Sequence, residues 1–207
     1  MSTPIRILLA DDHPPLREGL ASILNSQPEF TVVAEAGSGS EVLEIVSRES
    51  IDLFILDLRM PGGDGIQTIK ELTKRDPNSR ILVLTTYDNE EDVFNALEAG
   101  ALGYLPKDTK RAEIIEAVVQ VHAGNRYLTK AIANRLADRM VRPGLTAREL
   151  DVLRFLMRGK SNKEMAAAMF ISEETVKTRM KTLFQKLGVH DRTEAVAVAL
   201  QRGLLRL

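Results

Sequence analysis

Apolar and polar positions divide this chain into two regions with different periodicities. Between residues 5 and 123, short apolar runs alternate with stretches in which apolar residues recur every three to four positions. Short runs are typical of buried strands, and the three-to-four recurrence is typical of amphipathic helices. After residue 145 only the helical recurrence remains. The pattern predicts an α/β domain over residues 1–123, a linker over 124–144 and an all-helical domain over 145–207.

Five strand–helix units make up the first region. Its most apolar strand, Ile51–Leu56, has the composition of a central parallel strand that is buried on both faces. Regular alternation predicts a five-stranded, doubly wound parallel sheet with helices on both faces. The predicted elements, strand and helix in turn, are Ile5–Ala10, Pro14–Asn25, Thr31–Ala36, Ser40–Arg48, Ile51–Leu56, Gly65–Arg75, Ile81–Leu84, Glu90–Ala99, Leu102–Leu105 and Arg111–His122.

The pattern in the last region predicts a small domain of four helices. The linker before it carries one amphipathic helix, Lys130–Met140, and ends at Pro143-Gly144. Thr146, Ser161 and Ser172 are predicted N-caps, the first two with a Glu three positions on, which is a capping box. A short turn between the second and third helices gives a helix-turn-helix pattern. The four predicted helices are Thr146–Met157, Asn162–Met169, Glu173–Leu187 and Arg192–Gln201.

Charge is distributed unevenly between the two regions. Residues 1–141 carry 15 Lys and Arg against 22 Asp and Glu, a net charge of −7, whereas residues 142–207 carry 13 against 7, a net charge of +6. An acidic body with a basic C-terminal domain indicates that the C-terminal domain binds a polyanion. Chance variation of surface charge is the alternative.

Composition narrows the class of protein further. There is no Cys, which excludes disulfides and thiolate metal sites and fits a reducing compartment. The N-terminal apolar run is too short for a signal peptide, and no run approaches the roughly 18 apolar residues of a membrane span. We therefore expect a cytoplasmic location.

Residues with complementary chemistry follow the predicted strands. Asp11 and Asp12 follow the first strand and Asp57 the third, while Thr85 and Lys107 follow the fourth and fifth. The carboxyl ends of parallel strands converge on one crevice. Clustered carboxylates repel one another unless a hard cation such as Mg²⁺ neutralises them, and a lysine suits a phosphate oxygen. The set predicts a site for a divalent cation and a phosphoryl group, although any one Asp taken alone could be only a turn residue.

These residues lie in motifs that resemble the receiver domain of two-component response regulators, which has a flavodoxin-like fold. The matching segments are Leu9–His13, Leu56–Gly62, Leu84-Thr85 and Gly103–Asp108. The resemblance implies that Asp57 accepts a phosphoryl group from a histidine of a sensor histidine kinase. It also implies that Asp11, Asp12 and Asp57 bind Mg²⁺ together with the backbone carbonyl of Arg59.

The same resemblance implies a switch around the phosphoryl group. Thr85 would bond a phosphoryl oxygen, Lys107 would pair with it, and Tyr104 would turn inward as Thr85 moves. Two positions depart from the family pattern. Pro106 precedes Lys107, whereas many receivers place Pro directly after the Lys, and Gly63 stands where a bulkier residue is common. The chain therefore has no Lys–Pro bond at this position, because Asp108 follows Lys107.

The predicted helix Glu173–Leu187 has an apolar side and a basic side. Lys177, Thr178 and Lys181 lie opposite the apolar positions, and the two lysines are one turn apart. A recognition helix places such a side in the major groove, where Lys and Thr reach base edges or phosphates. A solvated basic face on a helical bundle is the alternative reading of the helix taken alone.

Residues 145–203 resemble the LuxR-type DNA-binding domain. The matching segments are Leu145–Glu149, Gly159–Glu164, Ile171-Ser172, Thr175–Thr178 and Lys186–Val189, with Arg192. The resemblance implies contacts with double-stranded DNA from Lys177, Thr178 and Lys181. It also implies dimerisation through the last helix, for which the candidate residues are Ala195, Val196 and Ala199. Arg179 stands where many members have His and is a candidate phosphate contact.

Both halves together resemble a NarL/FixJ-type response regulator. The resemblance implies a homodimer on phosphorylation, binding to paired promoter half-sites and regulation of transcription, with RNA polymerase as a further partner left open. It implies no enzyme activity beyond the receiver's own phosphorylation and dephosphorylation. Three alternatives remain: a constitutive transcription factor with a silent receiver, an aspartyl-phosphate phosphatase or phosphotransferase, and a protein-binding regulator whose basic domain does not read DNA sequence.

Overall fold

The computed structural model describes residues 3–61, 63–86 and 89–205. All residues proposed for the functional sites fall in these ranges, and Gly62 of the receiver-like motif lies outside them. The chain forms two compact units, one of residues 1–88 and 92–134 and the other of residues 89–91 and 135–207. The predicted domain bounds at residues 123 and 145 stay predictions.

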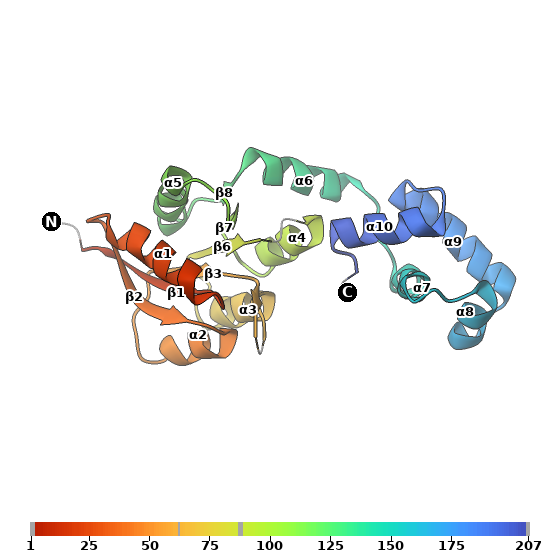
Figure 1. Ribbon diagram of the computed structural model, residues 1–207, viewed down its shortest axis with the longest axis horizontal. Helices are drawn as coiled ribbons and strands as arrows, with labels where there is room; N and C mark the ends of the chain where they lie inside the picture. The colour runs from red at the N-terminus through yellow and green to blue at the C-terminus, as the bar shows by residue number, and fades with distance from the viewer. Residues whose placement is uncertain (1–2, 62, 87–88, 206–207) are drawn as a thin grey trace. The chain divides into compact units, whose positions relative to one another are not determined.

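A parallel sheet forms the centre of the first unit (Figure 1). The strand order is β2-β1-β3-β6-β7-β8, and every neighbouring pair is parallel. The strand order changes direction at β1, which lies between β2 and β3, as in a doubly wound fold. This arrangement confirms the predicted fold class. The strands are β1 (Ile5–Ala10), β2 (Phe30–Ala36), β3 (Leu53–Leu56), β6 (Ile81–Thr85), β7 (Gly103–Pro106) and β8 (Tyr127–Leu128).

The strand count differs from the predicted five because β8 comes from the segment predicted as linker. The amide of Tyr127 donates to the carbonyl oxygen of Leu102 at 3.0 Å, and Leu128 pairs with Tyr104 of β7. A strand of two residues is too short to show a period of two, so the sequence pattern gives no signal for it. The antiparallel pair of β4 (Arg59–Met60) and β5 (Gly63–Asp64) was not predicted either, because each of these strands also has only two residues.

Helices cover both faces of the sheet, as the alternation predicts. Side chains of α1 (Pro14–Asn25) and α5 (Arg111–His122) pack with Ile7 and Leu9 of β1 in one core cluster. Side chains of α2 (Gly39–Ile45), α3 (Gly65–Arg75) and α4 (Glu90–Glu98) pack with Leu8 and Ala10 in the other. Successive residues of β1 therefore serve opposite faces, which is the arrangement of a strand buried on both sides.

The second unit is helical. Its helices pack around one apolar cluster that includes Val152, Met165, Val176, Leu183 and Ala195. Capping boxes are present at Thr146 with Glu149 and at Ser161 with Glu164, and Ser172 accepts a hydrogen bond from the Thr175 amide, as predicted. The helices are α7 (Ala147–Met157), α8 (Asn162–Met169), α9 (Glu173–Leu187) and α10 (Arg192–Arg202), and α6 (Lys130–Val141) contributes residues to both units.

Within residues 3–61, 63–86 and 89–205, no helix combines the length and the apolar character that crossing a bilayer requires.

Candidate functional site

The carboxyl ends of four neighbouring strands bring the predicted acidic crevice together. Asp11 directly follows β1, Asp57 follows β3, Thr85 ends β6 and Lys107 follows β7. Backbone bonds hold these strand ends in register, since the Asp57 amide donates to Ala10 and the Lys107 amide donates to Thr85, both at 2.9 Å. The side chains of Asp11, Asp57 and Thr85 are buried. A buried crevice with two carboxylates, a hydroxyl and an ammonium therefore forms where the sequence predicts it.

Lys107 joins two of the three acids. Its Nζ lies 2.7 Å from Oδ2 of Asp11 and 2.7 Å from Oδ2 of Asp57. Burial by itself lowers the pKa of Lys107, but hydrogen bonds to Asp11 and Asp57 and their negative charges outweigh burial and raise this pKa above its usual value of 10.5. The ammonium group is therefore charged throughout the physiological range, and it neutralises part of the acidic cluster.

Asp12 lies at the more exposed side of the crevice, beside His13. The ring Nδ1 of His13 lies 2.9 Å from Oδ1 of Asp12, and the His13 amide donates to Oδ1 of Asp11 at 2.9 Å. His13 occupies the N-cap position of α1, yet its side chain makes no capping hydrogen bond. It lines the acidic edge instead, so that one ligand atom from each of Asp11, Asp12 and His13 lies within 4.8 Å of the others.

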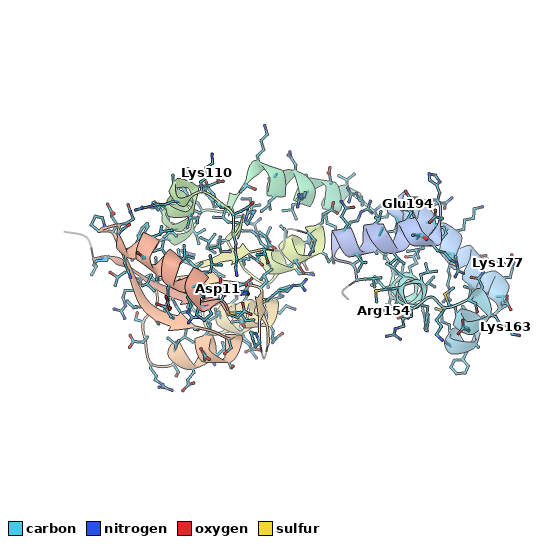
Figure 2. All side chains as sticks on the ribbon, in the orientation of Figure 1. Asp11, Lys110, Arg154, Lys163, Lys177 and Glu194 are labelled. Atoms are coloured by element: carbon cyan, nitrogen blue, oxygen red, sulfur yellow. The ribbon has the colours of Figure 1, made fainter. Side chains whose placement is uncertain are left out.

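The donor set fits a hard divalent cation. Carboxylate oxygens are the ligands that Mg²⁺ prefers in proteins, and it keeps several waters, which suits a site with an exposed side. Asp11 is buried and Asp12 is partly exposed, so together they offer oxygen atoms both to the crevice and to solvent (Figure 2 labels Asp11). Asp57 lies on the adjoining strand end and shares Lys107 with Asp11.

The remaining two predicted receiver residues flank this crevice. The Arg59 amide donates to Oδ1 of Asp57 at 3.3 Å, which places the start of β4 beside the candidate phosphoacceptor. The Arg59 side chain reaches Asp92 of α4, with 3.6 Å between Nη2 and Oδ2. Tyr104 lies in β7 and is completely buried. Tyr104 is thus already inside in this structure, and its part in a switch stays a prediction.

Gly65 lies beside the candidate phosphoacceptor and was not singled out by the sequence. It begins α3, and its amide donates to the Leu58 carbonyl at 3.0 Å. A Cβ atom at this position would lie 2.6 Å from the Asp57 carbonyl oxygen and 2.6 Å from the Leu58 Cα. Both neighbours are backbone atoms that cannot rotate away. Glycine is therefore required for α3 to begin this close to the candidate phosphoacceptor, whereas the sequence pattern indicated only the start of a helix here.

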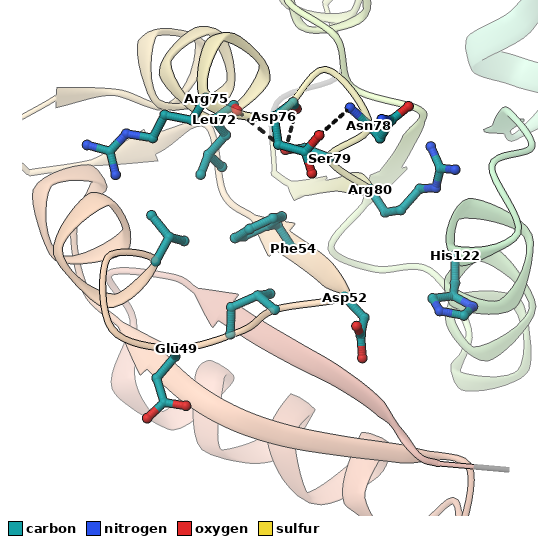
Figure 3. A pocket seen from close by; sticks show the side chains of 12 residues that line it. Glu49, Asp52, Phe54, Leu72, Arg75, Asp76, Asn78, Ser79, Arg80 and His122 are labelled. Atoms are coloured by element: carbon teal, nitrogen blue, oxygen red, sulfur yellow. Dashed lines mark hydrogen bonds between the residues drawn. The ribbon is translucent and has the colours of Figure 1, made fainter.

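A separate cavity lies near the amino-terminal ends of the central strands. Its volume is about 400 Å³, and it is lined by Phe54 of β3, by Arg80 just before β6 and by His122 of α5 (Figure 3). Asp57 and Thr85 lie at the opposite ends of these two strands. Strands rise about 3.3 Å per residue, so this cavity does not open onto the candidate phosphoacceptor. It offers no substrate pocket for an aspartyl-phosphate enzyme acting through Asp57.

The second candidate site is the helix-turn-helix formed by α8 and α9. Val176, Met180, Leu183 and Leu187 turn the apolar side of α9 into the core. Lys186 fastens the end of α9 to the start of α7, because its Nζ lies 2.8 Å from Oε2 of Glu149. The rest of α9 is thereby held in one orientation, with its other side in solvent.

That solvent side carries the predicted DNA contacts. Lys177, Thr178 and Lys181 are exposed, and Arg179 is half-buried. Lys163 of α8 and Lys177 of α9 project from the end of the domain that these two helices form (Figure 2). Lys177 pairs only loosely with Glu174, at 3.4 Å, so its charge is available to a polyanion.

The predicted dimerisation residues of α10 lie differently. Ala195 and Ala199 are completely buried in the core of their own domain, and Val196 is half-buried against the same core. A partner could not reach Ala195 or Ala199 in this arrangement. The side of α10 that faces solvent is formed by Thr193, Glu194, Ala197 and Gln201. Dimerisation through α10 stays a prediction.

Comparison with known proteins decides the family. The family described as response regulator receiver domain matches residues 7–119, which is more than half of the chain. The family described as bacterial regulatory proteins, luxR family, matches residues 143–199. The chain belongs to the two-component response regulators with a LuxR-type DNA-binding domain.

Curated relatives align with this chain over nearly its full length. The uncharacterized transcriptional regulatory protein YhcZ of Bacillus subtilis is 42% identical, with 97% of each chain covered. The nitrate/nitrite response regulator protein NarP of Escherichia coli is 36% identical, again with 97% of each covered. These relatives identify the chain as a response regulator of the NarL type.

Solved structures agree with this assignment. The response regulator ChrA of a heme-sensing two-component system is 44% identical with a TM-score of 0.59, and the match covers 99% of this chain and 100% of that one. The RcsB response regulator of Salmonella typhimurium is 25% identical with a TM-score of 0.79, covering 93% and 98%. An RcsB–DNA complex, 24% identical with a TM-score of 0.75 and coverage of 96% and 99%, has the same fold.

Proposed function

We propose that this response regulator is phosphorylated on Asp57 by a sensor histidine kinase, and that phosphorylation controls its dimerisation and its binding to promoter DNA. The observation that carries the proposal is the shared ion pair of Lys107 with Asp57 and Asp11, 2.7 Å to each, next to the buried hydroxyl of Thr85. It supports a role for Asp57 as acceptor, because a phosphoryl group there meets a cation and a hydroxyl that are already in place.

The chemistry is a transfer between two phosphoryl carriers. An Oδ atom of Asp57 attacks phosphorus, the P–O bond forms as the P–N bond to the kinase histidine breaks, and the leaving imidazole takes up a proton. Such transfers pass through a loose transition state, so catalysis is mostly positioning and charge neutralisation. Mg²⁺ held by Asp11, Asp12, Asp57 and the Arg59 carbonyl would supply further neutralising charge when bound.

The proposed switch begins with Lys107 and Thr85. On phosphorylation, Lys107 exchanges the Asp57 carboxylate for a phosphoryl oxygen, and the Thr85 hydroxyl bonds another. Thr85 and Tyr104 lie on the neighbouring strands β6 and β7, two positions apart in the register, so a movement at Thr85 would act on the strand that carries the buried Tyr104. A population shift of this kind can expose or create a dimerisation surface.

The DNA-binding step rests on α9. We propose that Lys177, Thr178 and Lys181 contact base edges or phosphates in the major groove, with Arg179 as a phosphate contact. Two copies of the domain would bind paired half-sites whose spacing follows the geometry of the dimer.

Gel filtration with light scattering tests the switch. Wild type and Asp57→Ala are measured with Mg²⁺, with and without acetyl phosphate or beryllofluoride. The expected result is a Mg²⁺-dependent shift to dimer in wild type only. A shift in both proteins would place the acceptor elsewhere, and the absence of a shift in wild type would contradict phosphorylation-controlled dimerisation.

A further inference from the structure

The turn between α8 and α9 has an unusual backbone. Phe170 has φ 55° and ψ 44°, which is the left-handed helical conformation. Within the described ranges it is the only residue other than glycine with positive φ. The other left-handed or positive-φ positions are Gly100, Gly124, Gly159, Gly188 and Gly203. Among the described residues, glycine therefore adopts positive φ at five places and a bulky aromatic residue does so at one.

A side chain at this position strains the backbone. In L-residues the left-handed conformation brings Cβ too close to the following carbonyl oxygen, and for a bulky residue it is a true outlier. Glycine or asparagine would adopt it with less strain. Strained residues of this kind concentrate at functional sites. The presence of phenylalanine here thus calls for a role of its ring.

The ring has no role inside the chain. Phe170 is 95% exposed, so it buries almost nothing in the folded protein. Its neighbour Ile171 is half-buried and packs against the core of the domain, which anchors the turn. A fully solvated aromatic ring on an anchored turn gains apolar burial only when a partner covers it.

The position of Phe170 indicates which partner this is. It comes two residues before Ser172, the N-cap of α9, and the first turn of a recognition helix is the part that meets base edges. That first turn carries Glu173 and Glu174, which suit cytosine amino groups and disfavour phosphates. When α9 lies in the major groove, a side chain beside this end of the helix lies near base edges. The apolar group that a base edge presents in the major groove is the thymine methyl group, and Phe is among the side chains that contact it.

We propose that Phe170 contacts the 5-methyl group of a thymine at the edge of each half-site and so contributes to sequence specificity. This inference rests on the proposed DNA-binding function and adds a contact outside the basic side of α9. Lys177 and Lys181 supply charge, whereas Phe170 supplies discrimination between thymine and the other bases.

Thymine replacement tests the contact. The full-length protein, with Mg²⁺ and beryllofluoride, selects duplexes from a random-sequence pool. A selected duplex is then made again with each thymine replaced in turn by deoxyuridine, which lacks only the methyl group. We expect one replacement in each half-site to weaken wild-type binding about fourfold, the effect of one buried methyl group. Phe170→Asn should bind the unmodified duplex equally weakly and lose nothing more at that replacement.

Stability measurements separate contact from folding. Asn adopts the left-handed conformation with less strain, so the melting temperature of Phe170→Asn should equal or exceed that of wild type. Val141→Asn is the matched control, because Val141 of α6 is 86% exposed and should leave DNA binding unchanged.

Four results would overturn the proposal. The first is a melting temperature of Phe170→Asn below that of wild type, and the second is an unchanged affinity of this variant for the duplex. The third is an equal loss of affinity in Val141→Asn. The fourth is a loss of affinity in Phe170→Asn while no deoxyuridine replacement weakens binding by wild type. The last three results leave DNA binding by the wild type intact. If instead wild type enriches no sequence from the pool, the proposed sequence-specific DNA binding itself fails together with the contact.

Discussion

Nζ of Lys107 lies 2.7 Å from Oδ2 of Asp57, at the bottom of a crevice that also holds Asp11. Replacing Lys107 with Met would leave two buried carboxylates facing each other without a counter-charge. Removing one partner of a buried pair costs about 3–5 kcal/mol. We therefore expect Lys107→Met to lower the free energy of unfolding by about this amount in EDTA, as measured by urea denaturation.

Mg²⁺ should reverse much of this loss. A divalent cation bound to the same carboxylates supplies the missing positive charge, so Mg²⁺ should stabilise Lys107→Met more than it stabilises wild type. Lys110→Met is the control, since Lys110 is exposed at the start of α5 (Figure 2) and should change neither stability nor the response to Mg²⁺. Equal stabilisation of the variant and wild type by Mg²⁺ would contradict a cation site at these acids.

The crevice was predictable because the topology of a parallel sheet determines which residues meet. Once apolar runs identify β1, β3, β6 and β7 as parallel strands, the residues at their carboxyl ends must meet, and Asp11, Asp57 and Lys107 do so. The sixth strand was missed because Tyr127–Leu128 is too short for a periodic signal. Gly65 was missed because only the packing of α3 on the Asp57–Leu58 backbone reveals the need for glycine.

The apolar residues of α10 illustrate a different limit. Ala195 and Ala199 have the helical spacing of an apolar stripe, and a stripe has the same appearance whether it meets a partner or its own core. In the structure both alanines are completely buried in their own domain. The left-handed backbone of Phe170 was equally invisible, because phenylalanine is a residue that no turn rule places there.

Gly65→Ala should disturb the candidate phosphoacceptor directly. The added Cβ would lie 2.6 Å from the Asp57 carbonyl oxygen, so the Asp57–Leu58 backbone or the start of α3 must move. Overpacking of this kind costs about 1–3 kcal/mol. A displacement of about 1 Å at a reacting group can slow a reaction by about 100-fold. We expect a slower rate of phosphorylation from acetyl phosphate, measured by intact-protein mass spectrometry.

Gly19→Ala is the matched control for this prediction. Gly19 lies inside α1 and is exposed, and a Cβ atom there would meet nothing within 4 Å. The substitution should stabilise the protein by about 0.4–1 kcal/mol and leave the phosphorylation rate unchanged. If Gly65→Ala phosphorylates as fast as Gly19→Ala, the close approach of α3 has no functional importance.

Substitutions at Lys177 and Lys181 should separate base contacts from phosphate contacts. If a lysine binds phosphate, its replacement by Ala lowers affinity for all sequences and reduces the salt slope by about 1. If it binds a base edge, the replacement costs about 1–3 kcal/mol and relaxes specificity at one position. Fluorescence anisotropy over a salt series, with selected and scrambled duplexes, distinguishes the two. Lys130→Ala in α6 should change neither quantity, and identical curves for all three variants would exclude α9 as the DNA-binding helix.

Glu149 and Lys186 should make the second unit sensitive to acid. Burial by itself raises the pKa of Glu149, but hydrogen bonds from Lys186 and Thr146 outweigh it and hold this pKa below its usual value of 4.5. A carboxylate with a lowered pKa stabilises the folded state fully above pH 4.5, and this contribution is lost as pH falls through the folded-state pKa. At pH 7, Glu149→Gln should cost about 1.5–3 kcal/mol, the range for hydrogen bonds to a charged group.

The difference between wild type and Glu149→Gln should therefore shrink as pH falls below 4.5. Hydrogen exchange at the α7 amides reports the stability of this region without interference from the first unit. Glu174→Gln is the control, because the Glu174 side chain is 80% exposed and its contact with Lys177 is long, at 3.4 Å. It should leave exchange in α7 unchanged at every pH. A wild-type advantage that stays constant from pH 7 to acid conditions would show that Glu149 acts through packing and neutral hydrogen bonds rather than through its charge.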